Sequence, residues 1–95
     1  MFTTLAEVAI EDFDQFLRVF SDAGFQARRR HGSQGAEAFR VAEDAKAAVV
    51  LIDWKDRESF DGFVADMEVK ATMRSGSATR PPKFTFIERA GRFDA

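Results

Sequence analysis

The longest apolar run of the chain predicts a buried β-strand. This run, Ala47–Trp54 (AAVVLIDW), is eight residues long and has a charged residue on each side. It is too short to cross a membrane as a helix, and Val49, Val50 and Ile52 are β-branched, which favours a strand. Both alternating sets of side chains are apolar as far as Asp53, a pattern typical of a central strand covered on both faces. We therefore expect the rest of the chain to cover this strand.

Two segments carry apolar side chains at the spacing of an amphipathic helix. The first segment is Asp12 to about His31, and the second is Asp56 to about Asp66. The apolar positions are Phe13, Phe16, Leu17 and Phe20 in the first segment, and Phe60, Phe63, Val64 and Met67 in the second. Asp12 and Asp56 are placed to act as N-caps, and Gln15 is placed to reach back to Asp12. Both segments are therefore predicted to be helices that bury one face.

Both predicted helices are expected to be irregular. Gly24 either interrupts the first helix or only weakens it. After the second helix, a bend near Asp66 is expected to lead into a further turn or two from Met67 to Arg74.

Arg28–Arg30 end the first helix, and consecutive residues on a helix point in different directions. We interpret these three arginines as a solvated face that complements the helix dipole.

Three shorter segments complete the predicted sheet. They are Phe2–Ile10, about Gly35–Val41 and Lys83–Arg89, and Ala90–Ala95 is a tail. The element order β-α-β-β-α-β predicts an α+β, ferredoxin-like domain spanning residues 1–95. Its four-stranded antiparallel sheet has both helices on one face. Because the central strand is apolar on both faces, we expect a homodimer in which the two sheets pack together.

Composition excludes several classes of function. The net charge of −2 gives no overall attraction to nucleic acid or to an anionic membrane, so neither is expected as a partner. The chain has no Cys and one His, and its carboxylates show no ligand-like spacing, so neither a metal site nor a cofactor is expected. The first residues lack the pattern of a signal peptide, which predicts a cytoplasmic location. Eleven Phe residues suggest an oligomer interface or a lined cavity.

Three stretches of the sequence together resemble the antibiotic biosynthesis monooxygenase-like family of dimeric α/β barrels. They are Val8–Phe20, Arg40–Lys55 and Phe60–Glu88, and the most specific parts are the Val-Leu-Ile-Asp-Trp strand end and the late Phe-x-Phe-Ile-Glu run. The resemblance implies subunits paired through their sheets and a small-molecule pocket between each sheet and its helices. Family members include cofactor-independent monooxygenases acting on polyketides, haem-degrading enzymes and proteins of no known activity.

The sequence departs from the haem-degrading members of this family. Those members use an Asn on the first strand, whereas this chain has no Asn. Their haem-ligand position falls at or near Met73, and the single histidine, His31, lies elsewhere. Trp54 does match the strand-end tryptophan of the family. The resemblance therefore argues against haem degradation. If the protein is an enzyme, the resemblance implies a cofactor-independent oxidation of a phenol.

Three side chains are candidates for catalysis, each with a structural alternative. Trp54 either stacks on an aromatic substrate or belongs to the core. His31 is the candidate general base, or it is a charge at a helix end. Arg40 holds a carboxylate or enolate of the ligand, or it forms an ion pair with Glu7 or Glu88.

Five apolar side chains are candidates for lining a ligand cavity, and a plain core explains them equally well. They are Phe39, Phe60, Phe63, Met67 and Met73.

Three functions remain open from the sequence. The protein is an enzyme that oxidises an aromatic or polyketide-like molecule, a binding or stress-associated module for a small apolar ligand, or a purely structural dimer. The first two predict a cavity of roughly 300 Å³ or more between sheet and helices, with Trp54 and Arg40 on its wall. The third predicts no cavity large enough for a ligand.

Overall fold

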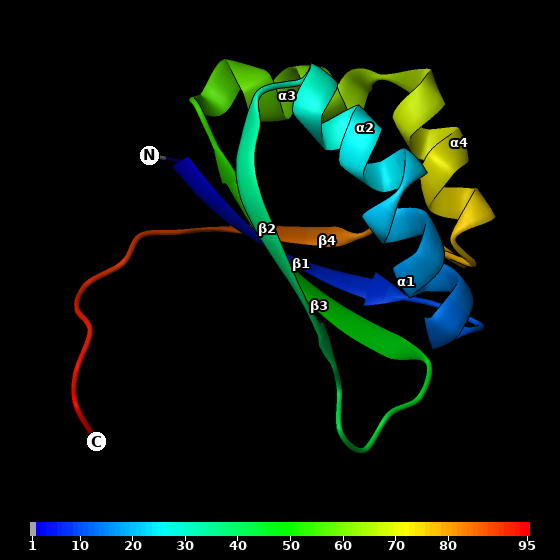
Figure 1. The fold of residues 1–95 in the computed structure, drawn as a ribbon, viewed down its shortest axis with the longest axis horizontal. Helices are drawn as coiled ribbons and strands as arrows, with labels where there is room; N and C mark the ends of the chain where they lie inside the picture. Colours follow the sequence, from blue (N-terminus) through cyan, green and yellow to red (C-terminus); the bar gives the residue numbers. More distant parts are fainter. Residues whose placement is uncertain (1) are drawn as a thin grey trace.

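The computed structural model describes residues 2–95 and confirms the α+β, ferredoxin-like fold. In this part of the chain a four-stranded antiparallel sheet in the order β2-β3-β1-β4 carries its helices on one face (Figure 1). The elements are β1 (Phe2–Ala9), α1 (Phe13–Ser21), α2 (Ala23–Arg30), β2 (Ser33–Arg40), β3 (Ala47–Trp54), α3 (Arg57–Ala65), α4 (Met67–Ser75) and β4 (Lys83–Ile87).

The predicted central strand coincides with β3, which lies between β2 and β1. Its even-numbered side chains, Ala48, Val50, Ile52 and Trp54, are buried under the helices. Trp54 is fully buried, and its indole Nε1 donates a hydrogen bond of 3.0 Å to Oγ1 of Thr4 on β1, which is also fully buried. The ring of Phe63 on α3 packs on Trp54 with its centroid 4.9 Å away. Trp54 therefore joins β3, β1 and α3 in one core.

The opposite side of the sheet, which we call the open face, is covered by no helix (Figure 1). Leu5 on β1 lies beside Leu51 on β3 at its centre, and both side chains are partly buried. Polar pairs lie nearby: Thr3 Oγ1 donates to Asp53 Oδ1 at 2.7 Å, and Lys83 lies 3.8 Å from Glu7. The central position of β3 is therefore confirmed, and within the described residues helices cover one of its two faces.

The first predicted helix is two helices, α1 and α2, so of the two alternatives left open at Gly24 the interruption is confirmed. The chain breaks at Asp22, whose φ of −118° and ψ of −88° are not helical. Gly24 lies in the first turn of α2, where an added Cβ would meet the carbonyl oxygen of Val19 at 2.9 Å. The absence of a side chain at Gly24 thus allows α2 to begin close against the end of α1.

The other helix predictions are mostly confirmed. Asp12 and Asp56 accept hydrogen bonds from the backbone N–H groups of Gln15 (3.1 Å) and Ser59 (2.8 Å), so both act as N-caps. The bend near Asp66 separates α3 from α4. The expected return contact of Gln15 is wrong, because its side-chain Nε2 donates instead to the carbonyl oxygen of Ser75 at 2.7 Å.

The connection from α4 to β4 is tied to the end of β1. Ala78 forms an isolated antiparallel bridge with Ile10, and the N–H of Thr79 donates to the carbonyl oxygen of Ala9 at 3.0 Å. Ser77 Oγ donates to the carbonyl oxygen of Asp12 at 2.9 Å. This connection, 77–79, is therefore tied by hydrogen bonds to the end of β1 and the start of α1.

The C-terminal part of the chain is less regular than predicted. Strand β4 ends at Ile87 rather than Arg89, and residues 88–95 leave the sheet as a tail (Figure 1). Phe93 on this tail is 86% exposed. Among residues 2–95, no helix is long and apolar enough to span a membrane.

Candidate functional site

A cavity of about 80 Å³ lies between the sheet and the helices. We call it the inner cavity. Its walls are apolar except for Arg28 and Thr72. Apolar side chains on its wall are Ala6, Val8, Phe16, Val19, Phe20, Ala27, Val50, Ile52, Phe63, Val69, Met73, Ala78, Pro82 and Phe84. The position agrees with the predicted pocket between sheet and helices, but the volume is well below the expected 300 Å³.

A second, wider depression of about 400 Å³ lies next to the inner cavity, and we call it the outer hollow. The two share four wall residues, which are Met73, Ala78, Pro82 and Phe84. The outer hollow carries three exposed cations, Lys70, Arg74 and Arg80, and none of the described residues on its wall is acidic. The apolar inner cavity therefore adjoins a positively charged outer hollow.

Arg28 is the one charged side chain on the wall of the inner cavity among residues 2–95. It is only 8% exposed, which corrects the prediction that Arg28–Arg30 form a solvated face. Its NH1 donates to the carbonyl oxygen of Phe20 at 2.9 Å, and its guanidinium carbon lies 3.8 Å from the centroid of the Phe20 ring. Burial lowers the pKa of Arg28 to about 10, so the guanidinium remains charged at neutral pH.

The three candidate catalytic residues are not brought together at the inner cavity. Trp54 is buried in the core and is not part of the cavity wall. Arg40 lies at the far end of β2, because β3 pairs Arg40 with Ala48 but Trp54 with Ser33. The guanidinium of Arg40 stacks 4.5 Å from the ring centroid of Phe13. Its ion pair is with Asp14 on α1 at 3.9 Å, so the expected partners Glu7 and Glu88 are wrong.

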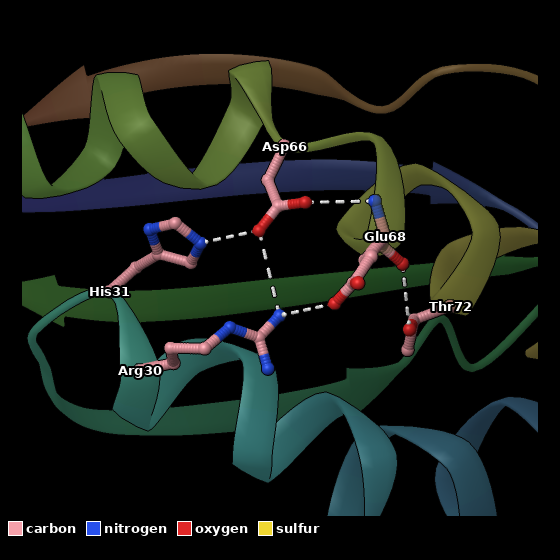
Figure 2. A network of polar contacts seen from close by, with 5 residues as sticks. All are labelled: Arg30, His31, Asp66, Glu68 and Thr72. Carbon is pink, nitrogen blue, oxygen red and sulfur yellow. Dashed lines mark hydrogen bonds and ion pairs between the residues drawn. The ribbon is translucent and has the colours of Figure 1, made fainter.

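His31 belongs to a polar cluster at the junction of α2, α3 and α4 (Figure 2). Its Nε2 donates to Asp66 Oδ2 at 2.8 Å, since a carboxylate can only accept. Arg30 lies 3.5 Å from the same oxygen, and the backbone N–H of Glu68 donates to the other carboxylate oxygen at 2.8 Å. The hydrogen bond from His31, followed by that from Glu68, holds the pKa of Asp66 below its usual value. His31 and Arg30 therefore fasten the end of α2 to the bend between α3 and α4.

The five candidate lining residues are distributed over four places. Phe63 and Met73 lie on the wall of the inner cavity. Phe60 is buried against Trp54, with a ring centroid distance of 5.9 Å, outside the cavity wall. Phe39 pairs with Val49 on the open face and is 45% exposed, while Met67 is 68% exposed at the start of α4.

Sequence reasoning missed four functional candidates, all of them cations: Arg28, Lys70, Arg74 and Arg80. A signal for Arg28 was present, because Phe20, Gly24 and Arg28 are spaced four residues apart and continue the apolar stripe of the first predicted helix. No comparable signal existed for the other three, since the segment 77–82 between α4 and β4 decides which residues they face. Among the described residues, no group of His, Cys, Asp or Glu could hold a metal ion.

The cluster around Asp66 predicts a specific dependence of stability on pH. Because the pKa of Asp66 is lowered in the folded state, its contribution to stability is present above its unfolded value of 3.8 and is lost as the pH falls below that value. Asp66→Asn should therefore lower the urea midpoint at about pH 7, and the difference from wild type should shrink toward about pH 3. Urea titrations at several pH values measure this.

Asp61→Asn is the matched control, because Asp61 is exposed and its ion pair within residues 2–95 is with Arg57 on the same helix, at 3.3 Å. Its midpoint should stay close to that of the wild type at every pH. An Asp66→Asn midpoint equal to the wild-type value at about pH 7, or a deficit that persists undiminished in acid, would contradict the role given to this carboxylate.

Comparison with known proteins gives the fold but no close relative. No family model and no curated protein matches the chain. Among solved structures, SnoaB, a cofactor-independent oxygenase from Streptomyces nogalater, superposes with a TM-score of 0.74 at 14% identity, covering 99% of this chain and 97% of that one. A putative antibiotic biosynthesis monooxygenase from Nitrosomonas europaea gives a TM-score of 0.68 at 16% identity, covering 96% and 100%.

A further match, to a putative antibiotic biosynthesis monooxygenase from Caulobacter crescentus, has a TM-score of 0.72 at 13% identity and covers 95% of this chain and 90% of the other. These identities establish the fold alone, and they do so over nearly the whole chain. The resemblance seen in the sequence is thus confirmed in three dimensions: the chain has the fold of the antibiotic biosynthesis monooxygenases.

Proposed function

We propose that this protein binds a small aromatic or polyketide-like molecule, with its apolar part in the inner cavity and its polar part in the outer hollow. The observation that carries the proposal is the set of residues shared by the two spaces. Binding sites for small molecules are mostly apolar, with a few polar groups placed to orient the ligand. The inner cavity supplies the apolar walls, and the outer hollow supplies the polar groups.

The volumes constrain how such a ligand fits. An apolar cavity of about 150 Å³ can take up benzene, and the inner cavity is about half that size. A ring therefore needs the wall between the two spaces to move. Met73 lies on that wall, and an unbranched methionine side chain changes rotamer readily. A shift of Met73 would join the inner cavity to the 400 Å³ of the outer hollow.

A cavity-filling substitution tests this binding site. Ala27 is buried on the wall of the inner cavity, so Ala27→Leu should fill the space and lower the affinity for 2-naphthalenemethanol by about tenfold or more. Chemical-shift titration of the ¹⁵N-labelled protein measures the affinity. Ala23→Leu, at the exposed first position of the same helix, is the matched control and should bind like the wild type.

Two results would reject the proposed site. One is a wild-type protein that shows no saturable shifts at cavity residues with 2-naphthalenemethanol. The other is Ala27→Leu binding the probe as tightly as Ala23→Leu while remaining folded.

Oxygenation of the bound molecule is a second candidate function. It is favoured by the fold shared with the cofactor-independent oxygenase SnoaB. None of the described residues on the wall of the inner cavity carries a carboxylate or an imidazole. A phenolic substrate would therefore lose its proton to solvent or in the outer hollow before reaction. Oxygen uptake with a panel of hydroxylated polycyclic compounds distinguishes turnover from binding alone.

We also propose that two copies of the chain pair through their open faces. Leu5, Val49, Leu51 and Ile87 are all partly buried on this face, although no helix covers it. Phe39 extends the apolar surface over β2. A second copy would cover these side chains around a two-fold axis, as most homodimers do.

A further inference from the structure

We propose that the natural ligand of the inner cavity carries an anionic oxygen, a carboxylate or an ionised phenol, and that Arg28 binds it. This inference rests on the proposed function and specifies the chemical class of the ligand. It assigns the recognition of charge to a residue on α2 that the sequence had placed in solvent.

Arg28 is buried without a counterion. Among residues 2–95 no carboxylate lies within ion-pair distance of its guanidinium. A guanidinium has five N–H donors, and the described hydrogen bond of Arg28 uses one nitrogen, NH1, to reach the carbonyl oxygen of Phe20. Taking a charge out of water is costly unless a partner compensates it. The free donors beside an apolar cavity therefore suit an oxyanion of the ligand.

The surroundings of the site favour the same charge. Lys70, Arg74 and Arg80 line the outer hollow without an acidic residue on its wall, although the chain as a whole is weakly acidic. A concave surface lined by one sign of charge concentrates molecules of the opposite sign. An anionic ligand is thus attracted to the outer hollow first and is then paired with Arg28.

A purely structural role for Arg28 accounts for only part of its environment. The carbonyl oxygen of Phe20 belongs to the last turn of α1, where backbone acceptors lack helical partners, and Arg28 satisfies it. The ring of Phe20 shields one face of the guanidinium. Neither contact neutralises the charge, and neither requires Arg28 to lie on the cavity wall.

Two probes with the same naphthalene ring, one anionic and one neutral, test the inference. Wild-type protein should bind 2-naphthoate about tenfold more tightly, or more, than neutral 2-naphthalenemethanol, because hydrogen bonds to a charged group are the strong ones. Arg28→Met should reduce this ratio to about one, and Arg28→Lys should retain part of it. Arg29→Met, at the exposed neighbouring position, is the control and should keep the wild-type ratio.

The stability of the variants separates binding from structure. Arg28→Met removes a buried charge, but it also leaves the carbonyl oxygen of Phe20 without its donor. Its Tm should therefore fall by roughly 4–8 °C while the variant stays folded. If the variant does not fold, the wild-type protein still gives an answer through the Nε–H signal of Arg28. This signal should shift with 2-naphthoate and stay unchanged with 2-naphthalenemethanol.

Each other outcome overturns the inference in a recognisable way. Equal binding of the two probes by the wild type rejects it but leaves the proposed function intact. A preference for 2-naphthoate that survives in Arg28→Met rejects Arg28 and moves charge recognition to the outer hollow. Failure of both probes to bind rejects the proposed function and the inference together.

Discussion

Replacing Trp54 by alanine should largely unfold the protein. The indole is fully buried and packs on Phe60 and Phe63. Its removal from the core costs about 3–5 kcal/mol. It also leaves the buried hydroxyl of Thr4 without its partner, which costs about 1–3 kcal/mol more. Since small domains are stable by only about 5–15 kcal/mol, circular dichroism with urea titration should show a sharply lowered midpoint or no folded baseline.

A set of milder variants separates packing from hydrogen bonding at this position. Trp54→Phe and Thr4→Val each leave one buried polar group unpaired, so each should be destabilising. The double variant removes both groups and should lose less than the sum of the two single losses. Phe93→Ala, on the exposed tail, should leave the midpoint unchanged. Additive losses in the double variant would show that the hydrogen bond contributes nothing.

Replacing Leu51 by lysine should convert the proposed homodimer into a monomer. Leu51 lies on the open face of β3 between Leu5 on β1 and Glu37 on β2. In a two-fold symmetric interface each substitution occurs twice, so two ammonium groups would have to be buried. Light scattering after size exclusion should give twice the 10.7 kDa chain mass for the wild type and a single chain mass for the variant.

Leu17→Lys is the matched control for this experiment. Leu17 is a partly exposed leucine on α1, on the helix side of the molecule, and its substitution should leave the dimer intact. A wild-type protein that is monomeric at micromolar concentration would reject the proposed pairing. So would a Leu51→Lys protein that stays folded and dimeric.

The sequence predicted the fold well because strong local patterns agreed with it. Strand β3 was predicted with its observed ends, since seven of its eight residues are apolar and charged residues lie on both sides. The caps at Asp12 and Asp56 were predicted because aspartate accepts from the exposed N–H groups of a first turn. An interruption near Gly24 was one of two alternatives, but its exact place at Asp22 was not predicted, because the break depends on how α2 packs against Val19.

The site was predicted less well, because it depends on contacts between distant segments. The resemblance predicted a pocket between sheet and helices, where the inner cavity lies, but it did not predict the charged residue on its wall. Arg28 was grouped with Arg29 and Arg30, whereas the structure separates it from both by burial. His31 stood out as the single histidine, but its partner Asp66 lies 35 residues away on the α3–α4 bend. Such pairs are set by the packed structure and leave no local pattern.

The hydrogen bonds between the segment 77–79 and β1 indicate which wall of the proposed ligand site can move. Ala78 and Thr79 are bound to the backbone of Ile10 and Ala9, so we expect this side of the outer hollow to be rigid. The facing side is α4, which carries Met73 and begins directly after the bend at Asp66. For the ligand proposed above, we therefore expect entry to the inner cavity through a shift of side chains on α4, such as Met73, rather than through movement of the segment 77–79.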